Sequence, residues 1–295
     1  MTLTAPAPMS IPPPLATVPG MTPPDRPTPV GQRRPVDPHP ADRFQPVKSA
    51  DRALEVLEAL AASPDQPSLV DLSRTLGIPK SSLHGILRTL SRRGWVESDP
   101  TGTRFRLGMR ALQVGAAYLD SDDTVGLLGT ILDDLARQFG ETVHLGRLDG
   151  AYVVYLAKRE SVHPLRLYSA IGRRLPAHAT ALGKALLAER PDDVVDQLLT
   201  YPLAALTPHT VTDRDALLAD LAAVRANGYA VDREESTAGV VCIAMALPLR
   251  TPALDAISLS VPVTRLDADG EQRIVGALRR AADEVQVARG LLSAT

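Results

Sequence analysis

Small polar and basic side chains recur along one short segment, Lys80–Arg92, which reads KSSLHGILRTLSR. Leucine and isoleucine at three- and four-residue steps predict a helix with one buried side. Short polar side chains on the other side could reach base edges, and arginine could meet guanine or phosphate in a DNA major groove. The residues expected to contact DNA are Lys80, Ser81, Ser82, His84, Gly85, Arg88 and Arg92.

A second short helix precedes this one. Leucines at helical spacing in residues 69–76 follow Ser68, a plausible N-cap, and Gly77 and Pro79 end the helix. Two helices joined by a glycine-containing turn predict a helix-turn-helix. The alternative is an ordinary helical hairpin with a solvated basic face.

The following residues favour the first interpretation. Residues 95–98 and 104–107 have the composition of strands, and 99–102 that of a turn, so we expect a basic hairpin, the wing of a winged helix. Arg104 and Arg106 lie two residues apart and therefore share one face of their strand. We expect that face to lie along phosphates.

Length and composition limit the number of domains and the class of protein. The chain has 295 residues, enough for two domains, and its one cysteine, Cys242, excludes an internal disulfide and fits a reducing cytosol. Apolar runs are too short for a membrane span and the N-terminus lacks a signal peptide, so we expect a soluble, cytoplasmic protein. Residues 46–110 hold ten Lys/Arg against seven Asp/Glu, whereas the whole chain has a net charge of −2. The positive charge is concentrated around the helix-turn-helix.

The chain divides into four expected parts. Residues 1–45 hold thirteen of the twenty-six prolines and predict a disordered tail, whose arginines could form a basic arm but are more simply solvated. Residues 46–107 form the DNA-binding domain, 108–122 a helical linker, and 123–295 a second domain. The first domain begins with a helix at 49–62. Its expected buried stripe is Ala50, Ala53, Leu54, Leu57, Leu60 and Ala61.

The second domain mixes both kinds of element. A helix is expected at 124–139, with Leu127, Leu128, Ile131, Leu132 and Leu135 on its buried face. Helices flanking one antiparallel sheet make an α+β domain of the size of a ligand-sensing module. Strands are expected at 142–146, 151–156, 165–168, 229–234, 240–247 and 253–261, and helices at 180–188, 192–199, 213–227 and 268–288.

Several blocks in this order resemble the IclR family of transcriptional regulators. Besides the helix-turn-helix and wing, they are residues 47–54, 175–185, 228–235 and 239–244. The resemblance implies a winged helix, a helical linker and a GAF-like effector domain. It also implies dimers or dimers of dimers that repress or activate neighbouring metabolic operons. Gly85 departs from the larger residue common in related recognition helices, so an operator sequence cannot be borrowed from relatives.

The resemblance also implies an effector site between the sheet and the helix that begins near Thr180. Independently, amides near that helix start could face an anion, and two hydroxyls two residues apart on an apolar strand point the same way. We therefore expect a small organic acid, hydroxylated or aromatic. The matching positions are Thr180, Ala181, Asp232, Cys242, Ser258 and Ser260.

Each of these residues also has a simpler interpretation. Thr180 could only cap its helix, Asp232 could pair with a nearby arginine such as Arg233 or Arg166, and Cys242 could be a small buried apolar residue. Ser258 and Ser260 could bond the backbone or lie on the solvent face. Lys184 is expected to be solvated, and His178 to be a structural histidine with its hydrogen bonds satisfied.

Two rival functions remain from the sequence. One is an enzyme with Cys242 as nucleophile and His178 as base. The other is a regulator that senses no ligand and uses its C-terminal domain only for assembly. No metal-ligand spacing or phosphate-binding loop is apparent, so neither a metal nor a cofactor is expected.

Overall fold

The computed structural model describes residues 45–63, 65–164 and 169–292. The disordered tail expected at 1–45 lies outside the described residues, apart from Gln45. The strand expected at 165–168 lies outside them as well.

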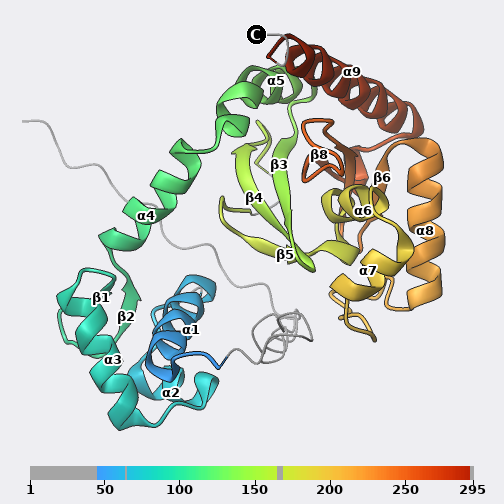
Figure 1. Ribbon diagram of the computed structural model, residues 1–295. Helices are drawn as coiled ribbons and strands as arrows, with labels where there is room; N and C mark the ends of the chain where they lie inside the picture. Colours follow the sequence, from blue (N-terminus) through green and yellow to red (C-terminus); the bar gives the residue numbers. More distant parts are fainter. Residues whose placement is uncertain (1–44, 64, 165–168, 293–295) are drawn as a thin grey trace, which may run out of the picture.

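Three helices and a hairpin form the first body of the structure (Figure 1). The hairpin strands pair antiparallel, with Glu97 opposite Arg106. Leucine, isoleucine and valine side chains from all three helices and the first strand share one small core. The elements are α1 (Lys48–Ala62), α2 (Leu69–Leu76), α3 (Lys80–Arg92), β1 (Val96–Ser98) and β2 (Phe105–Leu107).

Local chemistry fixes the turn between α2 and α3. Ser68 and Asp71 form a reciprocal capping box at the start of α2, which satisfies backbone N–H groups that have no partner within the helix. Gly77 ends α2 with φ of +64°, a backbone conformation that costs glycine little. The predicted cap, turn and second helix are thus confirmed.

The buried stripe on α1 is narrower than predicted: Leu60 is buried, and Ala53 and Leu57 are half-buried. Leu54 is 59% exposed, and Ala50 and Ala61 are also exposed, whereas Val56 is fully buried beside Leu60. Alanine and leucine recur at helical spacing around much of this helix. Contact with α2, α3 and β2, rather than composition, therefore decides which side faces the core.

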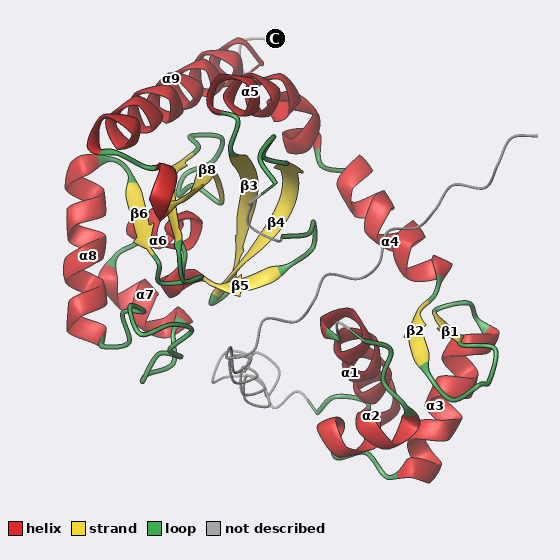
Figure 2. Ribbon diagram, turned by 180° about the vertical axis from the view of Figure 1, so that it is seen from behind, coloured by secondary structure: helices red, strands yellow, loops and turns green. Residues whose placement is uncertain are grey.

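One exposed helix joins the two bodies (Figures 1 and 2). This helix, α4 (Met109–Asp120), has no buried residue. The next, α5 (Asp123–Phe139), buries Leu128, Leu132 and Leu135, but Leu127, expected on the same face, is exposed.

A six-stranded antiparallel sheet forms the centre of the second body, with β3 and β8 in the middle. The predicted α+β architecture is confirmed. In spatial order the strands are β5 (Arg174–Pro176), β4 (Tyr152–Arg159), β3 (Thr142–Asp149), β8 (Asp255–Pro262), β7 (Val240–Ala246) and β6 (Ala230–Arg233).

Helices cover both faces of this sheet. One face packs against α5 and α9 (Ala268–Leu292), which lie side by side in Figure 2. The opposite face packs against a second group of helices. That group consists of α6 (Ala181–Ala188), α7 (Asp192–Leu198) and α8 (Arg214–Asn227), with the short 3-10 turn η1 (Ala177–Ala179) leading into α6. In the part of the chain that the structure describes, no helix has the length and apolarity to cross a bilayer.

We predict that Gly183→Ala destabilises the second body by about 1–3 kcal/mol, because a β-carbon at Gly183 would lie 2.1 Å from the Ala177 carbonyl oxygen. The matched control is Gly129→Ala in α5, where a β-carbon meets no atom within 4 Å and helix propensity favours alanine by up to about 1 kcal/mol. Chemical unfolding would measure both. Equal stability of the two variants would contradict the packing argument.

Candidate nucleic-acid interface and effector site

The outer face of α3 is open to solvent. Its cations Lys80, Arg88 and Arg92 form no ion pair with any described residue, so their charges are available to a polyanion. The helix is oriented by Leu83, Leu87 and Leu90, which are buried in the small core. All seven α3 residues expected to contact DNA are exposed: Lys80, Ser81, Ser82, His84, Gly85, Arg88 and Arg92.

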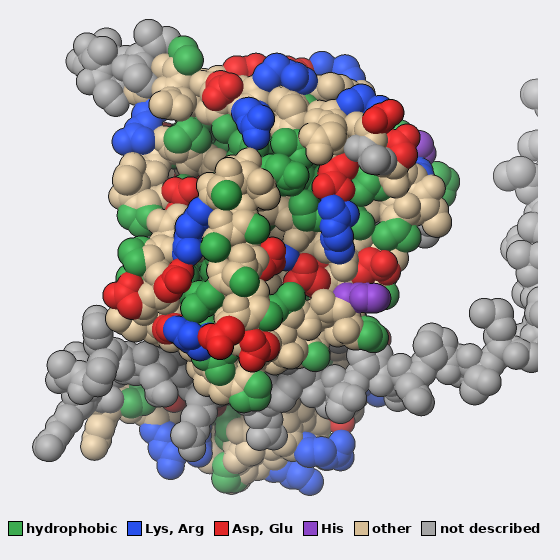
Figure 3. Space-filling model, turned by 90° about the vertical axis from the view of Figure 1, so that its right-hand side faces the viewer, with side chains coloured by type: hydrophobic (Ala, Val, Ile, Leu, Met, Phe, Trp, Pro, Cys, Tyr) green, Lys and Arg blue, Asp and Glu red, His purple; other side chains and the backbone are tan. Residues whose placement is uncertain are grey.

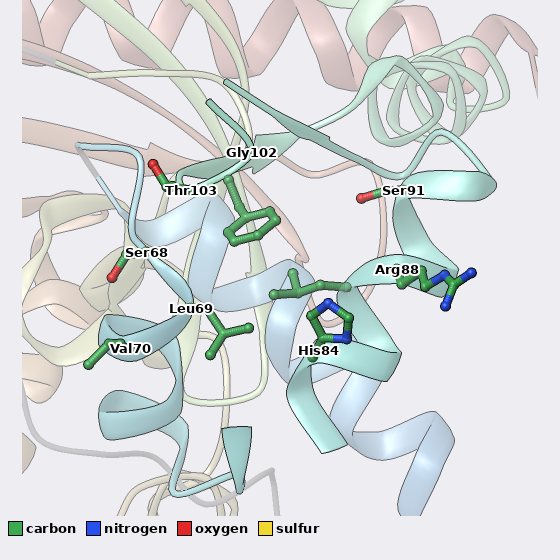
Figure 4. A pocket seen from close by; sticks show the side chains of 10 residues that line it. Ser68, Leu69, Val70, His84, Arg88, Ser91, Gly102 and Thr103 are labelled. Atoms are coloured by element: carbon green, nitrogen blue, oxygen red, sulfur yellow. The ribbon is translucent and has the colours of Figure 1, made fainter. Parts of the chain in front are cut away.

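A groove of about 420 Å³ runs between α3, the start of α2 and the wing turn (Figure 4). His84 and Ser91 point toward it from α3, while Arg88 extends outward. Thr103 and Phe105 contribute from the hairpin. Sequence reasoning missed Ser91, Thr103 and Phe105, because the groove forms only when the hairpin folds back beside the helices.

The two wing arginines are exposed but already have partners. Arg106 pairs with Glu97 across the hairpin at 2.9 Å, and Arg104 donates to the Gln66 carbonyl oxygen at 2.9 Å. Whether the two residues contact phosphates stays a prediction. Because Glu97 neutralises the charge of Arg106, we expect Arg106 to contribute less to DNA binding than Arg88 does.

The sheet brings four of the expected effector residues onto one face. Asp232 on β6 lies opposite Cys242 on β7, which lies opposite Ser260 on β8. Ser258 is two residues away on the same side. All four are buried on the face that packs against α6, and Ala181 lies in the same core cluster as Cys242.

Asp232 is held mainly by its own turn. Its Oδ1 accepts hydrogen bonds from the N–H groups of Glu235 at 2.7 Å and Ser236 at 3.2 Å, and its Oδ2 accepts from the Ser236 hydroxyl. Burial raises the pKa of Asp232 to about 6. The alternative pairing with Arg233 was wrong, because Arg233 binds Glu271 instead, and Arg166 lies outside the described residues.

Cys242 and His178 do not form a nucleophile–base pair. The Cys242 Sγ lies 3.2 Å from the Ser260 hydroxyl, and burial, with Asp232 nearby, raises the pKa of the thiol. His178 Nε2 lies 3.0 Å from the Ala204 carbonyl oxygen, as expected for a structural histidine. The thiol therefore stays protonated near neutral pH, and the hydrogen bond of His178 is made elsewhere.

His144 on β3 is a buried polar residue that sequence reasoning missed. It lies opposite Ser258, stacks on the Tyr155 ring at 4.3 Å, and places Nε2 2.7 Å from the Ser169 hydroxyl. Its Nδ1 is buried with no partner among the described residues. Burial, with Lys158 and Arg173 nearby, lowers the pKa of His144 to about 3, so the ring is neutral.

A β-bulge between Leu145 and Gly146 lies beside this stacked pair. Bulges redirect side chains and recur near functional sites. The only sequence signal for His144 was a histidine inside an apolar strand, and the register that brings it opposite Ser258 joins segments more than 100 residues apart.

The start of α6 offers free N–H groups beside this face. Thr180 caps the helix by accepting from the Gly183 N–H at 3.0 Å, as predicted. The N–H groups of Ala181 and Leu182 have no backbone partner in the described part of the chain. Free N–H groups at a helix start attract an anion.

Lys184 was expected to be solvated, and that expectation was wrong. Its side chain is buried, and its Nζ donates to Asp220 at 2.8 Å and to Glu235 at 2.6 Å. Burial lowers the pKa of Lys184, but the two carboxylates outweigh burial and the net shift is upward. These partners lie 36 and 51 residues away, so no local pattern indicated them. The described residues contain no group of three or more potential metal ligands.

Comparison with known proteins agrees with this architecture. The IclR helix-turn-helix domain model matches residues 49–100, and the model described as bacterial transcriptional regulator IclR C-terminal matches residues 116–287. The chain is 37% identical over 223 residues to the HTH-type transcriptional regulator XynR of Escherichia coli, which covers 75% of this chain and 88% of XynR. It is 36% identical over 244 residues to the glycerol operon regulatory protein of Streptomyces coelicolor, covering 81% and 95% of the two chains.

A solved structure extends the likeness to the fold. The IclR transcriptional regulator from Alicyclobacillus acidocaldarius superposes with a TM-score of 0.73 at 27% identity, covering 83% of this chain and 99% of that one. These findings agree on the family: the two domain models match in the expected order, the relatives match along nearly their whole length, and the fold is shared. The chain belongs to the IclR family of transcriptional regulators, with a helix-turn-helix DNA-binding domain and a C-terminal effector domain.

Proposed function

We propose that this regulator controls a metabolic operon by binding its operator through α3 and releasing or reshaping that contact when a small organic acid binds the C-terminal domain. In this proposal residues 46–107 bind DNA, 108–122 link the domains, 123–295 bind the effector, and the protein acts in the cytoplasm as a non-enzymatic regulator. The observation that carries it is the exposed α3 face with its unpaired cations. A relative named for the glycerol operon supports a metabolic target.

The effector is proposed to lie between the start of α6 and the sheet face that carries Ser258, Ser260 and Cys242. Free N–H groups at Ala181 and Leu182 suit its carboxylate. His144 Nδ1 is buried without a partner among the described residues, and the Ser258 hydroxyl comes from the position opposite His144 on β8, so the two suit a hydroxyl group of the ligand. Asp232 acts mainly by holding the turn behind Cys242.

A regulator that senses no ligand is the second candidate. It would need no buried polar atom left without a partner in its C-terminal domain. Buried polar atoms without partners are rare in proteins, and His144 Nδ1 is one. This atom favours the ligand-binding function.

We further propose that the protein works as a homodimer or a dimer of dimers, with a second copy covering α4. Met109, Leu112, Val114 and Tyr118 are large apolar or aromatic residues exposed on this helix. Exposed apolar surface of this kind marks association sites. A module of modest positive charge also gains affinity when two copies bind one operator.

We predict that Arg88→Ala weakens operator binding by about 1–3 kcal/mol, because its guanidinium is unpaired and exposed. The operator would come from genomic fragments captured by the purified protein, and fluorescence anisotropy at several salt concentrations would measure affinity. Arg106→Ala, which only breaks a pair with Glu97, should weaken binding less. Unchanged binding by Arg88→Ala would remove this residue from the DNA interface.

We predict that small carboxylic acids stabilise the protein against heat, whereas their uncharged amides do not. Lactate, succinate, benzoate and 4-hydroxybenzoate are suitable probes. Ser258→Ala should weaken binding of the best hydroxylated acid by about 0.5–1.5 kcal/mol, the range for a hydrogen bond between neutral groups, because its hydroxyl meets the hydroxyl group of the ligand. Ser161→Ala, another buried serine that bonds the Gly140 carbonyl, is the control. Stabilisation by the amides and not by the acids would contradict the proposal.

We predict that Leu112→Asp disrupts self-association, because it places a charge in the proposed apolar contact between copies. Analytical ultracentrifugation would show the shift toward monomer. Gln113→Asp, on the polar side of the same helix, should leave the assembly intact. Identical assembly in both variants would show that α4 is not the contact.

A further inference from the structure

A buried charge cluster lies between α6, α8 and the turn after β6. Lys184 is 1% exposed, and its one positive charge meets two carboxylates, Asp220 on α8 and Glu235 in the turn. The cluster therefore carries one negative charge in excess, shared between the buried Glu235 and Asp220, whose side chain is 35% exposed. Excess charge out of water is costly unless a further cation or donor compensates it.

One carboxylate oxygen of this cluster lacks a hydrogen-bond donor. Glu235 Oε1 accepts from Lys184, but Oε2 is buried and has no partner among the described residues. Asp220 uses Oδ2 for Lys184 and leaves Oδ1 without a side-chain hydrogen bond in the same part of the structure. Two acceptor atoms are thus available for a positively charged donor.

A groove of about 450 Å³ lies over these atoms. Ala223 and Val224 of α8 and Val231 of β6 supply apolar walls, and the Arg233–Glu271 ion pair lies on its rim. Figure 3 shows the side of the molecule that carries α8, where acidic side chains gather near the middle. The groove thus combines an acidic floor with aliphatic walls.

This groove is separate from the proposed effector site. It lies at the outer edge of the sheet, where Val231 and Arg233 of the edge strand β6 meet α6 and α8, and none of the six expected effector residues lines it. The two places are connected by one residue: Glu235, on the groove floor, donates its N–H to Asp232 at 2.7 Å.

We propose that this groove is a second ligand site and binds a small aliphatic primary amine. The ammonium group donates to Glu235 and Asp220, which balances the excess negative charge, and the alkyl chain lies against Ala223, Val224 and Val231. An ammonium offers three donors on a compact charge, which suits two neighbouring carboxylate oxygens. The site goes beyond the proposed effector function and does not depend on it.

Isothermal titration of the full-length protein with butylamine and 1,4-diaminobutane would test the proposal, with 1-butanol and potassium chloride as matched probes. Binding of the amines without binding of butanol is expected. Saturation by potassium at the same concentrations would indicate an inorganic-cation site only and would overturn the proposal, as would the absence of amine binding.

A matched pair of variants distinguishes the groove from the rest of the surface. Ala223→Arg places a guanidinium in the groove without removing any member of the charge cluster, and should weaken amine binding at least tenfold. Ala222→Arg adds the same charge at an exposed position of α8 outside the groove lining, and should bind like the wild type. Equal binding by the two variants would place the amine elsewhere. Failure of the carboxylic acids in the separate effector experiment would leave this result unaffected.

Discussion

Arg147 joins the end of the linker helix to the central sheet of the second body. This β3 residue donates to Asp255 on β8 at 2.6 and 3.0 Å, to Asp122 at the start of α5, and to the Tyr118 hydroxyl of α4 at 3.3 Å. Burial raises the pKa of Asp122, yet hydrogen bonds from Arg147 and Thr124 outweigh burial and hold it at about 2. Loss of the guanidinium would leave Asp255 as a buried charge without compensation, a situation that costs about 3–5 kcal/mol.

Strands β3 and β8 carry both the Arg147–Asp255 ion pair and the site of His144, whose Nδ1 is buried without a partner among the described residues. Arg147 lies opposite Asp255, and three residues earlier on β3 His144 lies opposite Ser258. In the function proposed above, a ligand between α6 and the sheet contacts β3 and β8. On the same strands, Arg147 and Asp255 hold the end of the linker helix α4. A small change in the spacing of β3 and β8 would reach α4 through one guanidinium, without a longer chain of contacts.

Local patterns predicted the elements well but not their long-range contacts. Capping residues and leucine spacing predicted α2, the turn and α3, because these signals act within one or two helical turns. The width of the buried stripe on α1 was wrong, because Leu54 and Val56 both fit a helical pattern and only packing decides between them. Lys184 looked like a surface lysine, because its partners come from elements far away in the sequence.

The candidate effector site shows the same division. Ser258 and Ser260 could be placed on one face, since alternation along a strand is a local property. His144 could not be added, because its position opposite Ser258 follows from the β3–β8 register. The hydrogen bonds of Asp232 to its own turn are local, but they become evident only once Glu234 adopts a positive φ of 64° and turns the chain back.

The placement of ion pairs explains how a chain with a net charge of −2 can present a cationic surface to DNA. In the described part of the second body, cations such as Arg159, Lys184, Arg214 and Arg225 each lie within 3 Å of a carboxylate. At distances larger than the separation of the two charges, each carboxylate therefore largely cancels the electric field of its cation. On α3, Lys80, Arg88 and Arg92 have no carboxylate partner among the described residues, so their positive charges are not cancelled locally. In the function proposed above, DNA would be attracted to these uncompensated charges, and the attraction would depend on how the charges are paired as well as on how many there are.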